Sequence, residues 1–286
     1  MDLELRTPPV EHLTELLAAL GRWQRDDDPF QLHPGDLGWF WRFGATTTAA
    51  ATRTWDSGGN PLVVGLLDEP DVLRLAIAPE ARLDDEAAAQ VVDDLVTPGR
   101  VLPAGRVAVE APVGSRVRAL LLERGWVERD PRAPLRHRLA SLPDVGLRIE
   151  QVEPATVGVR TAVQRAAFDR STFTDSRWHA MAEGPAYADA RCLVGYDDHG
   201  TAVAACTVWS AGPGRPGLLE PLGVHRDHRG HGFGTAIARA AAAALHALGA
   251  SSALVNTASS NVVAVATYAS AGFEPLPPVC DVVREA

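Results

Sequence analysis

The segment RGHGFG, residues 229–234, has the composition of a backbone anion site. The residues after it, 235–248, have strong helix propensity, and Gly249 is typical of a helix stop. Glycines directly before a helix let backbone N–H groups turn toward one point, where the helix N-terminus adds partial positive charge. The pattern predicts a site for a phosphate group, which we call the glycine loop (residues 229–234).

Two common phosphate-binding patterns do not fit the glycine loop. A dinucleotide fingerprint has the spacing G-x-G-x-x-G, whereas this loop reads G-x-G-x-G. A Walker loop requires a lysine after its second glycine, and the chain has no lysine. The loop therefore indicates another phosphate compound.

Residues on either side of the loop can contact the same ligand. Asn261 and Tyr268 are seven residues apart, which on a helix places them on one face two turns apart. Upstream, Gly223 interrupts a predicted strand, and a glycine there marks either a bulge or a place where another molecule approaches the backbone. The backbone of residues 222–224 is thus a candidate ligand contact.

These residues resemble two motifs of the GNAT superfamily of N-acetyltransferases. Arg229-x-x-Gly232-x-Gly234 is similar to the signature R/Q-x-x-G-x-G/A, which binds the acetyl-CoA pyrophosphate, and residues 261–273 are similar to N-x-x-A-x-x-x-Y-x-x-x-G-F. The resemblance covers residues 146–286 well and the first half in outline. It implies acetyl-CoA as the acyl donor and no metal. The implied acetyl-CoA contacts are Leu222, Gly223, Val224, Arg229, Gly230, His231, Gly232, Phe233, Gly234, Thr235 and Asn261.

Acetyl transfer to an amine requires two proton transfers. An alkyl amine with a pKa of ~10.4 is protonated at pH 7, and exposing its lone pair costs roughly 4–5 kcal/mol. The resemblance implies that Glu220, on the strand before the loop, receives this proton through water. Tyr268 would protonate the leaving thiolate, which is the smaller problem. The residues alone leave open that Glu220 is an exposed strand acid and that Tyr268 is a core residue.

Histidines and cysteines give little support for other chemistry. His225, His228 and His231 are three residues apart, but they share a loop that must also contact phosphate, so we expect no metal site. The three cysteines contain no C-x-x-C pair and are expected to be buried or idle thiols. Without a cysteine at the site, direct attack of the amine on the acyl donor is expected.

Composition excludes several classes of partner. Hydrophobic residues make up 46% and charged residues 22%, as in ordinary globular proteins. The net charge of −9 argues against nucleic acid as a partner. No apolar run reaches the ~18 residues of a membrane span, and the N-terminus lacks the pattern of a secretory signal. We expect a cytoplasmic protein without a membrane partner, either a monomer or a homodimer.

The two halves of the sequence repeat one pattern. Gly272 matches Gly125 and Val224 matches Ile77, and both pairs differ by 147 positions. Residues 139–146 have the composition of a linker. The expected fold class is α/β, of the mixed α+β kind, with two tandem GNAT-like domains at 1–142 and 143–286. Each would be a twisted mixed β-sheet flanked by helices.

The first half has lost the chemistry of the second. At the same offset, the glycine loop falls on residues 82–87, RLDDEA, where three acids would repel a pyrophosphate. Tyr268 falls on Leu121 and Asn261 on Gly114. We predict that domain 1–142 is degenerate and does not bind acetyl-CoA, and that domain 143–286 is catalytic.

The sequence therefore predicts an acetyl-CoA-dependent N-acetyltransferase that acts on a primary amine of a small molecule or peptide. The alternatives are a non-catalytic acyl-CoA sensor and an acyltransferase with a different acyl chain or nucleophile. Residues 166–187 are the expected acceptor side, with five residues that could form either an aromatic pocket or ordinary core: Phe168, Phe173, Trp178, His179 and Met181. Three acids there could attract a cationic amine or could be a solvated face: Asp169, Asp175 and Glu183.

Overall fold

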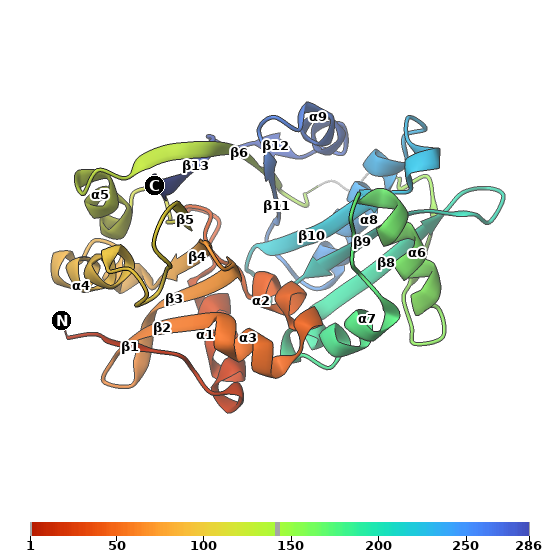
Figure 1. The fold of residues 1–286 in the computed structure, drawn as a ribbon. Helices are drawn as coiled ribbons and strands as arrows, with labels where there is room; N and C mark the ends of the chain where they lie inside the picture. Colours follow the sequence, from red (N-terminus) through yellow and green to blue (C-terminus); the bar gives the residue numbers. More distant parts are fainter. Residues whose placement is uncertain (1, 141–143, 286) are drawn as a thin grey trace. The chain divides into compact units, whose positions relative to one another are not determined.

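The computed structural model describes residues 2–140 and 144–285, and its fold is shown in Figure 1. The chain forms two compact units. The first unit comprises Met1–His33, Ala45–Arg132 and Pro278–Ala286, and the second comprises Pro34–Gly44 and Ala133–Pro277. Part of the predicted linker, residues 141–143, lies outside the described residues.

Each unit contains helices and strands from more than one segment of the chain. The first unit contains β1 (Glu4–Arg6), η1 (Val10–His12), α1 (Leu13–Trp23), α3 (Ala45–Ala51), β2 (Thr52–Ser57), β3 (Asn60–Glu69), β4 (Val72–Ile77), η3 (Pro79–Ala81), α4 (Asp85–Val96), β5 (Val107–Glu110), α5 (Arg116–Glu123) and β13 (Val279–Arg284). The second contains α2 (Pro34–Phe40), η2 (Trp41–Phe43), β7 (Arg148–Gln151), α6 (Val157–Ala167), α7 (Asp175–Ala182), η4 (Pro185–Asp189), β8 (Ala190–Tyr196), β9 (Ala202–Trp209), β10 (Gly217–Val224), η5 (Arg226–His228), α8 (Phe233–Ala247), β11 (Ala253–Ala258), α9 (Val262–Ser270) and β12 (Glu274–Pro275). Strand β6 (Val127–His137) contributes its first six residues to the first unit and the rest to the second.

The order of elements confirms the α/β fold class and the repeat. Each half has a strand, two or three helices, three strands and then two more helices that alternate with strands (Figure 1). Helices α5 and α9 end at Glu123 and Ser270, and 270 minus 123 is 147. Strands β6 and β12 begin at Val127 and Glu274, again 147 apart. The first half therefore has the same architecture as the second.

Each unit is built on a mixed sheet. The strand order is β1-β2-β3-β4-β5-β13-β6 in the first unit and β7-β8-β9-β10-β11-β6 in the second. The parallel pairs are β4 with β5 and β10 with β11. On β8, Cys192 contacts Arg160 of α6, while a Cβ at Gly195 would lie 3.5 Å from Ile237 of α8. Since side chains alternate along a strand, α6 and α8 cover opposite faces of this sheet.

Helix α8 carries the glycine loop at its N-terminus. Its alanines allow the helix to lie close to the sheet, and a Cβ at Gly217 of β10 would be only 2.4 Å from Leu245 Cδ2. The helix ends at Ala247, and Gly249 follows with a φ of +79°, a conformation that glycine adopts at low cost. The predicted helix and its glycine stop are confirmed.

The compact units are discontinuous in sequence, whereas the sequence pattern predicted one boundary near residue 142. Strand β13 pairs with β5 and with the start of β6, so residues 278–286 belong to the first unit. The end of β6 pairs with β12, and residues 133–140 therefore belong to the second. Residues 34–44 also group with the second unit, where α2 packs on β9 and β10.

A buried carboxyl on β13 gives a pH-dependent stability. Burial, with the negative charge of Glu110, raises the pKa of Asp281 to about 6, although Arg132 lies 3.6 Å away and opposes the shift. The folded chain thus binds more protons than the unfolded chain between pH ~4 and ~6. The stabilising contribution of Asp281 to the free energy of unfolding is fully present below pH ~4 and is lost as the pH rises through ~6.

We expect Asp281→Asn to raise the free energy of unfolding at pH 7.5 by about 1–2 kcal/mol, after allowance for solvent screening and for the lost pairing with Arg132. Urea unfolding from pH 4 to 7.5 should also show a flatter pH dependence than the wild type. Asp93→Asn, at an exposed aspartate of the same unit, is the control. An unchanged pH dependence in Asp281→Asn would contradict the assignment.

Candidate active site

Strand β10 presents open backbone groups beside a bulge. Its register on β9 shifts between Leu219 and Leu222, which is a bulge that contains Glu220. The N–H of His225 donates to the C=O of Val203 at 2.8 Å, so Val224 belongs to a non-hydrogen-bonded pair and turns its N–H and C=O away from β9. Leu222 has the same orientation because strand geometry repeats every second residue.

The other side of β10 is unpaired at these positions. Strand β11 pairs with β10 only at Gly217 and Leu218, although both strands continue. Within residues 2–140 and 144–285, the Leu222 C=O and the Val224 N–H have no hydrogen-bond partner. These two groups can bind a ligand. The backbone of Gly223 instead faces β9, and a Cβ on Gly223 would lie 2.6 Å from Ala167 Cβ, so packing also requires this glycine.

The glycine loop has the geometry of an anion site. Gly230 and Gly232 have φ values of +82° and +81°, and Gly232 is the N-cap of α8. No acceptor contacts the backbone N–H groups of residues 230–235 anywhere in the described part of the chain. Several N–H donors at a helix N-terminus, without protein acceptors, suit a phosphate or pyrophosphate.

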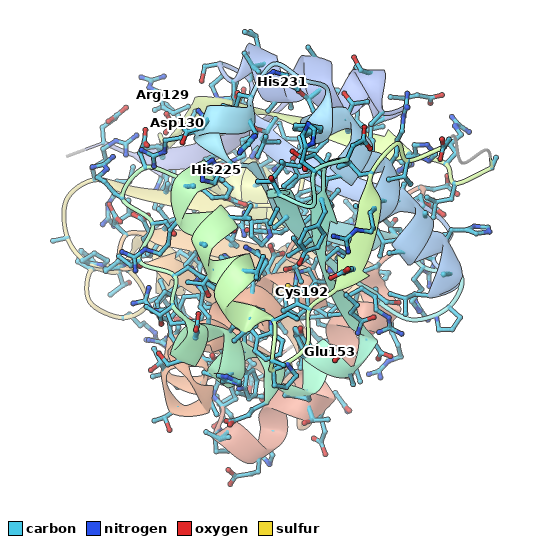
Figure 2. The ribbon with its side chains drawn as sticks, turned by 90° about the vertical axis from the view of Figure 1, so that its right-hand side faces the viewer. Arg129, Asp130, Glu153, Cys192, His225 and His231 are labelled. Atoms are coloured by element: carbon cyan, nitrogen blue, oxygen red, sulfur yellow. The ribbon has the colours of Figure 1, made fainter. Side chains whose placement is uncertain are left out.

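Two side chains of the glycine loop, Arg229 and His231, make contacts within the protein. The Arg229 guanidinium donates to the C=O of Ala167, the last residue of α6, at 2.7 Å. The His231 ring lies 2.9 Å from the Arg229 C=O through Nδ1 and stacks on Phe233, with 5.9 Å between ring centroids. Figure 2 shows His231 and His225 on the segment between β10 and α8. The side chains of Arg229 and His231 thus both have contacts within the protein. The backbone N–H groups of the loop remain as donors for a ligand.

Gly234 is where three elements meet. A Cβ at this position would lie 2.9 Å from Thr267 Cγ2 on α9 and 3.5 Å from Val224 Cγ2 on β10. The first turn of α8, which includes Thr235, is therefore adjacent to the open end of β10 and to the residue before Tyr268. The structure brings the predicted backbone contacts and Tyr268 into one region.

Tyr268 is 7% exposed and is held in its neutral form. Burial raises the pKa of its phenol well above the ordinary value, and the negative charge of Glu220 raises it further. A phenol that stays protonated at neutral pH can donate a proton.

Asn261 has a local structural role. It is the N-cap of α9, and its Oδ1 accepts a hydrogen bond from the Ala264 N–H at 3.2 Å. The helix begins one residue later, at Val262, so Asn261 lies at the start of the helix and not within its first turn. A cap residue satisfies one of the free N–H groups of the first turn.

Trp209 is a site residue that the sequence pattern did not predict. Its Nε1–H donates to the backbone C=O of Glu220 at 2.7 Å, and the residue is 1% exposed. The bond fixes the bulge from the neighbouring strand. An aromatic residue at the end of the strand before Glu220 was the available signal, but only the antiparallel register shows that the two residues meet.

The predicted acceptor residues separate into two groups. Phe173, Trp178 and Met181 are each no more than 3% exposed and belong to the core, as one of the two interpretations required. Phe168 is 37% exposed and packs beside Gly223, and His179 is also exposed. The three acids are exposed, and Asp169 lies 3.4 Å from Arg226.

The histidines, acids and cysteines of the described residues do not form a metal site, and two of the three thiols are buried. No group of three or more His, Cys, Asp or Glu side chains could hold a metal ion within the described ranges. Cys192, labelled in Figure 2, and Cys206 are buried free thiols, and Cys280 is partly buried. Burial raises the pKa of Cys206, which keeps it as a thiol. No described helix is long and apolar enough to cross a membrane.

Known proteins are similar to this chain in fold and, over part of its length, in sequence. Residues 160–273 match the model of the Acetyltransferase (GNAT) family. A solved structure described as a tandem GNAT protein from the clavulanic acid biosynthesis pathway is 18% identical, covers 99% of this chain and 98% of its own, and has a TM-score of 0.61. A GNAT-family acetyltransferase from Colwellia psychrerythraea is 17% identical over 99% and 100%, with a TM-score of 0.58. A GCN5-related N-acetyltransferase from Sphaerobacter thermophilus is 17% identical over 99% and 95%, with a TM-score of 0.57. None of the curated proteins matches this chain in sequence.

The fold over the whole chain is thus similar to that of a tandem GNAT protein. Residues 160–273 of the second half are similar to GNAT acetyltransferases in sequence, and the first half is GNAT-like by fold.

Proposed function

We propose that this protein is an acetyl-CoA-dependent N-acetyltransferase with one active site per chain, in the second unit. The observation that carries the proposal is the row of backbone N–H groups without acceptors at residues 230–235, next to the open backbone of Leu222 and Val224. A pyrophosphate and an amide-bearing arm are the parts of acetyl-CoA that match these two sets of groups. The family match of residues 160–273 supports the same donor.

The proposed binding site combines backbone and side-chain positions. The N–H groups of Gly230, His231, Gly232, Phe233, Gly234 and Thr235 would hold the pyrophosphate. Leu222 and Val224 would pair with the arm of the donor through the open side of β10. Arg229 would act by holding α6 against the loop, and Asn261 by fixing the start of α9.

Glu220 and Tyr268 would move the protons. Glu220 would receive a proton from the amine, directly or through water, and the free amine would then attack the acetyl carbonyl. Tyr268 would donate its proton to the departing thiolate, which its raised pKa permits because it remains protonated near neutral pH. Cys206 is fully buried and is kept as a thiol, so transfer would be direct.

The decisive experiment measures release of free CoA thiol from acetyl-CoA against a panel of small-molecule and peptide amines. Turnover with any amine, faster than hydrolysis alone, supports the proposal. Binding of acetyl-CoA without turnover on any amine would indicate a sensor, and absence of binding would contradict the assigned site. Parallel assays with longer acyl-CoA donors test the acyl-chain preference.

Tyr268→Phe should lower kcat by up to about 10², the usual contribution of a general acid, and leave the Kd for acetyl-CoA unchanged. The ring remains to pack on Phe273, with 5.7 Å between centroids, so the fold should be preserved. Tyr196→Phe, at the end of β8, is the matched control. If both variants turn over at the wild-type rate, Tyr268 is a packing residue.

A further inference from the structure

The first unit fills its counterpart of the acetyl-CoA site with its own chain. The N–H of Leu32 donates to the C=O of Leu75 at 3.0 Å, and the N–H of Ile77 donates to Gln31 Oε1 at 3.1 Å. Leu75 and Ile77 lie on β4, at the positions that the 147 offset relates to Leu222 and Val224 of β10.

The two pairs of positions have the same orientation. The N–H of Ala78 donates to the C=O of Leu62 at 2.8 Å, which turns the polar groups of Ile77 away from β3, just as the bond from His225 to Val203 does on β10. In the second unit these backbone groups are open within the described residues. In the first unit residues 31 and 32 bond them, in the manner proposed for the arm of acetyl-CoA.

The phosphate end of the first unit is filled as well. Asp84 is the N-cap of α4, and its carboxylate accepts from the Ala87 N–H at 2.8 Å, at a helix N-terminus equivalent to that of α8. Arg82, the counterpart of Arg229, forms an ion pair with Asp28 at 2.7 Å. This guanidinium holds the pKa of Asp28 below its usual value. A carboxylate thus occupies the anion position.

The segment that supplies these contacts, residues 24–33, is fixed by bonds to α1. Gln31 Nε2 donates to the Trp23 C=O, and Gln24 Nε2 donates to the C=O groups of Leu20 and Leu32, each at 3.1 Å. Gln31 and Leu32 are 5% and 3% exposed. Both ends of the Gln31 amide are therefore used, which makes this residue the centre of the attachment.

We propose that residues 24–33 are a permanent internal occupant of the first unit's degenerate cofactor site. Gln31 is then the residue that holds this occupant on β4, through its bond with the Ile77 N–H.

The test compares Gln31→Leu with Gln90→Leu in the full chain. Gln90 Oε1 accepts from the Leu3 N–H at 2.7 Å, so its variant loses a side-chain to backbone bond of the same kind elsewhere in the first unit. In Gln31→Leu, the Ile77 amide should exchange with deuterium about tenfold faster, the factor expected for loss of one net hydrogen bond. In Gln90→Leu, the Ile77 amide should exchange at the wild-type rate.

The outcomes separate this inference from the proposed function. One acetyl-CoA per wild-type chain, with faster Ile77 exchange only in Gln31→Leu, supports the internal occupant even if no amine is acetylated. Two acetyl-CoA molecules per chain, or unchanged Ile77 exchange, would overturn it.

Discussion

Glu220→Gln should lower kcat/KM for the amine by about 10³ at pH 7, within the range for loss of a general base. The variant keeps the size of the side chain and the Trp209 bond to the Glu220 backbone, so the bulge should persist. Deprotonation of the amine is the larger of the two proton problems, because its pKa lies roughly three units above neutral pH. The deficit should therefore shrink as the pH approaches 10, where the amine loses its proton without help.

A pH–rate profile of both proteins with one amine measures this effect. Glu150→Gln, at an acid on β7 of the same unit, is the matched control and should retain wild-type activity. A Glu220→Gln deficit that stays constant from pH 7 to 10 would show that Glu220 does not remove the amine proton. Equal activity at all pH values would remove Glu220 from the mechanism.

Gly232→Asp should weaken acetyl-CoA binding at least about 100-fold, because charge-assisted hydrogen bonds are worth about 1.5–3 kcal/mol each and several are replaced by repulsion. An aspartate N-cap would accept from the first turn of α8, as Asp84 does at α4. It would reproduce in the second unit the arrangement that fills the anion position in the first. Isothermal titration of the variant with acetyl-CoA gives the Kd.

Gly232→Ala separates charge from conformation. Gly232 has a φ of +81°, so any other residue there is strained, and a Cβ would contact no neighbouring atom within 4 Å. The alanine variant should lose some stability but much less affinity than the aspartate variant. Similar affinities in wild type and Gly232→Asp would show that the glycine loop does not hold the pyrophosphate.

Local features of the site were predictable because they depend on short stretches of sequence. The alanine run after residue 234 specifies a helix, and glycines at 230 and 232 permit the turn before it. The prediction for Gly223, a bulge or a ligand approach at this residue, was less accurate. The bulge lies just before this glycine, between Leu219 and Leu222, and Gly223 is also needed for contact with Ala167.

The remaining features depend on pairings between distant residues, which periodicity and propensity do not encode. Val282 of β13 pairs with Val109, and Gln31 bonds Ile77 across 46 positions. Trp209 reaches the Glu220 carbonyl only because β9 and β10 are antiparallel neighbours with a shifted register. Residues 34–44 belong to the first half of the sequence, but they pack in the second unit.

The insertion of β13 between β5 and β6 has a consequence for biosynthesis. Residues 279–284 supply an interior strand of the first sheet. That sheet therefore cannot be completed during synthesis when only the first half of the chain has left the ribosome. Until then β5 and β6 keep unpaired edges, which are the parts of a sheet most prone to association with other chains. For the same reason, cutting the gene between the two halves would yield a first fragment without an interior strand, so the two repeats are joined as one folding unit.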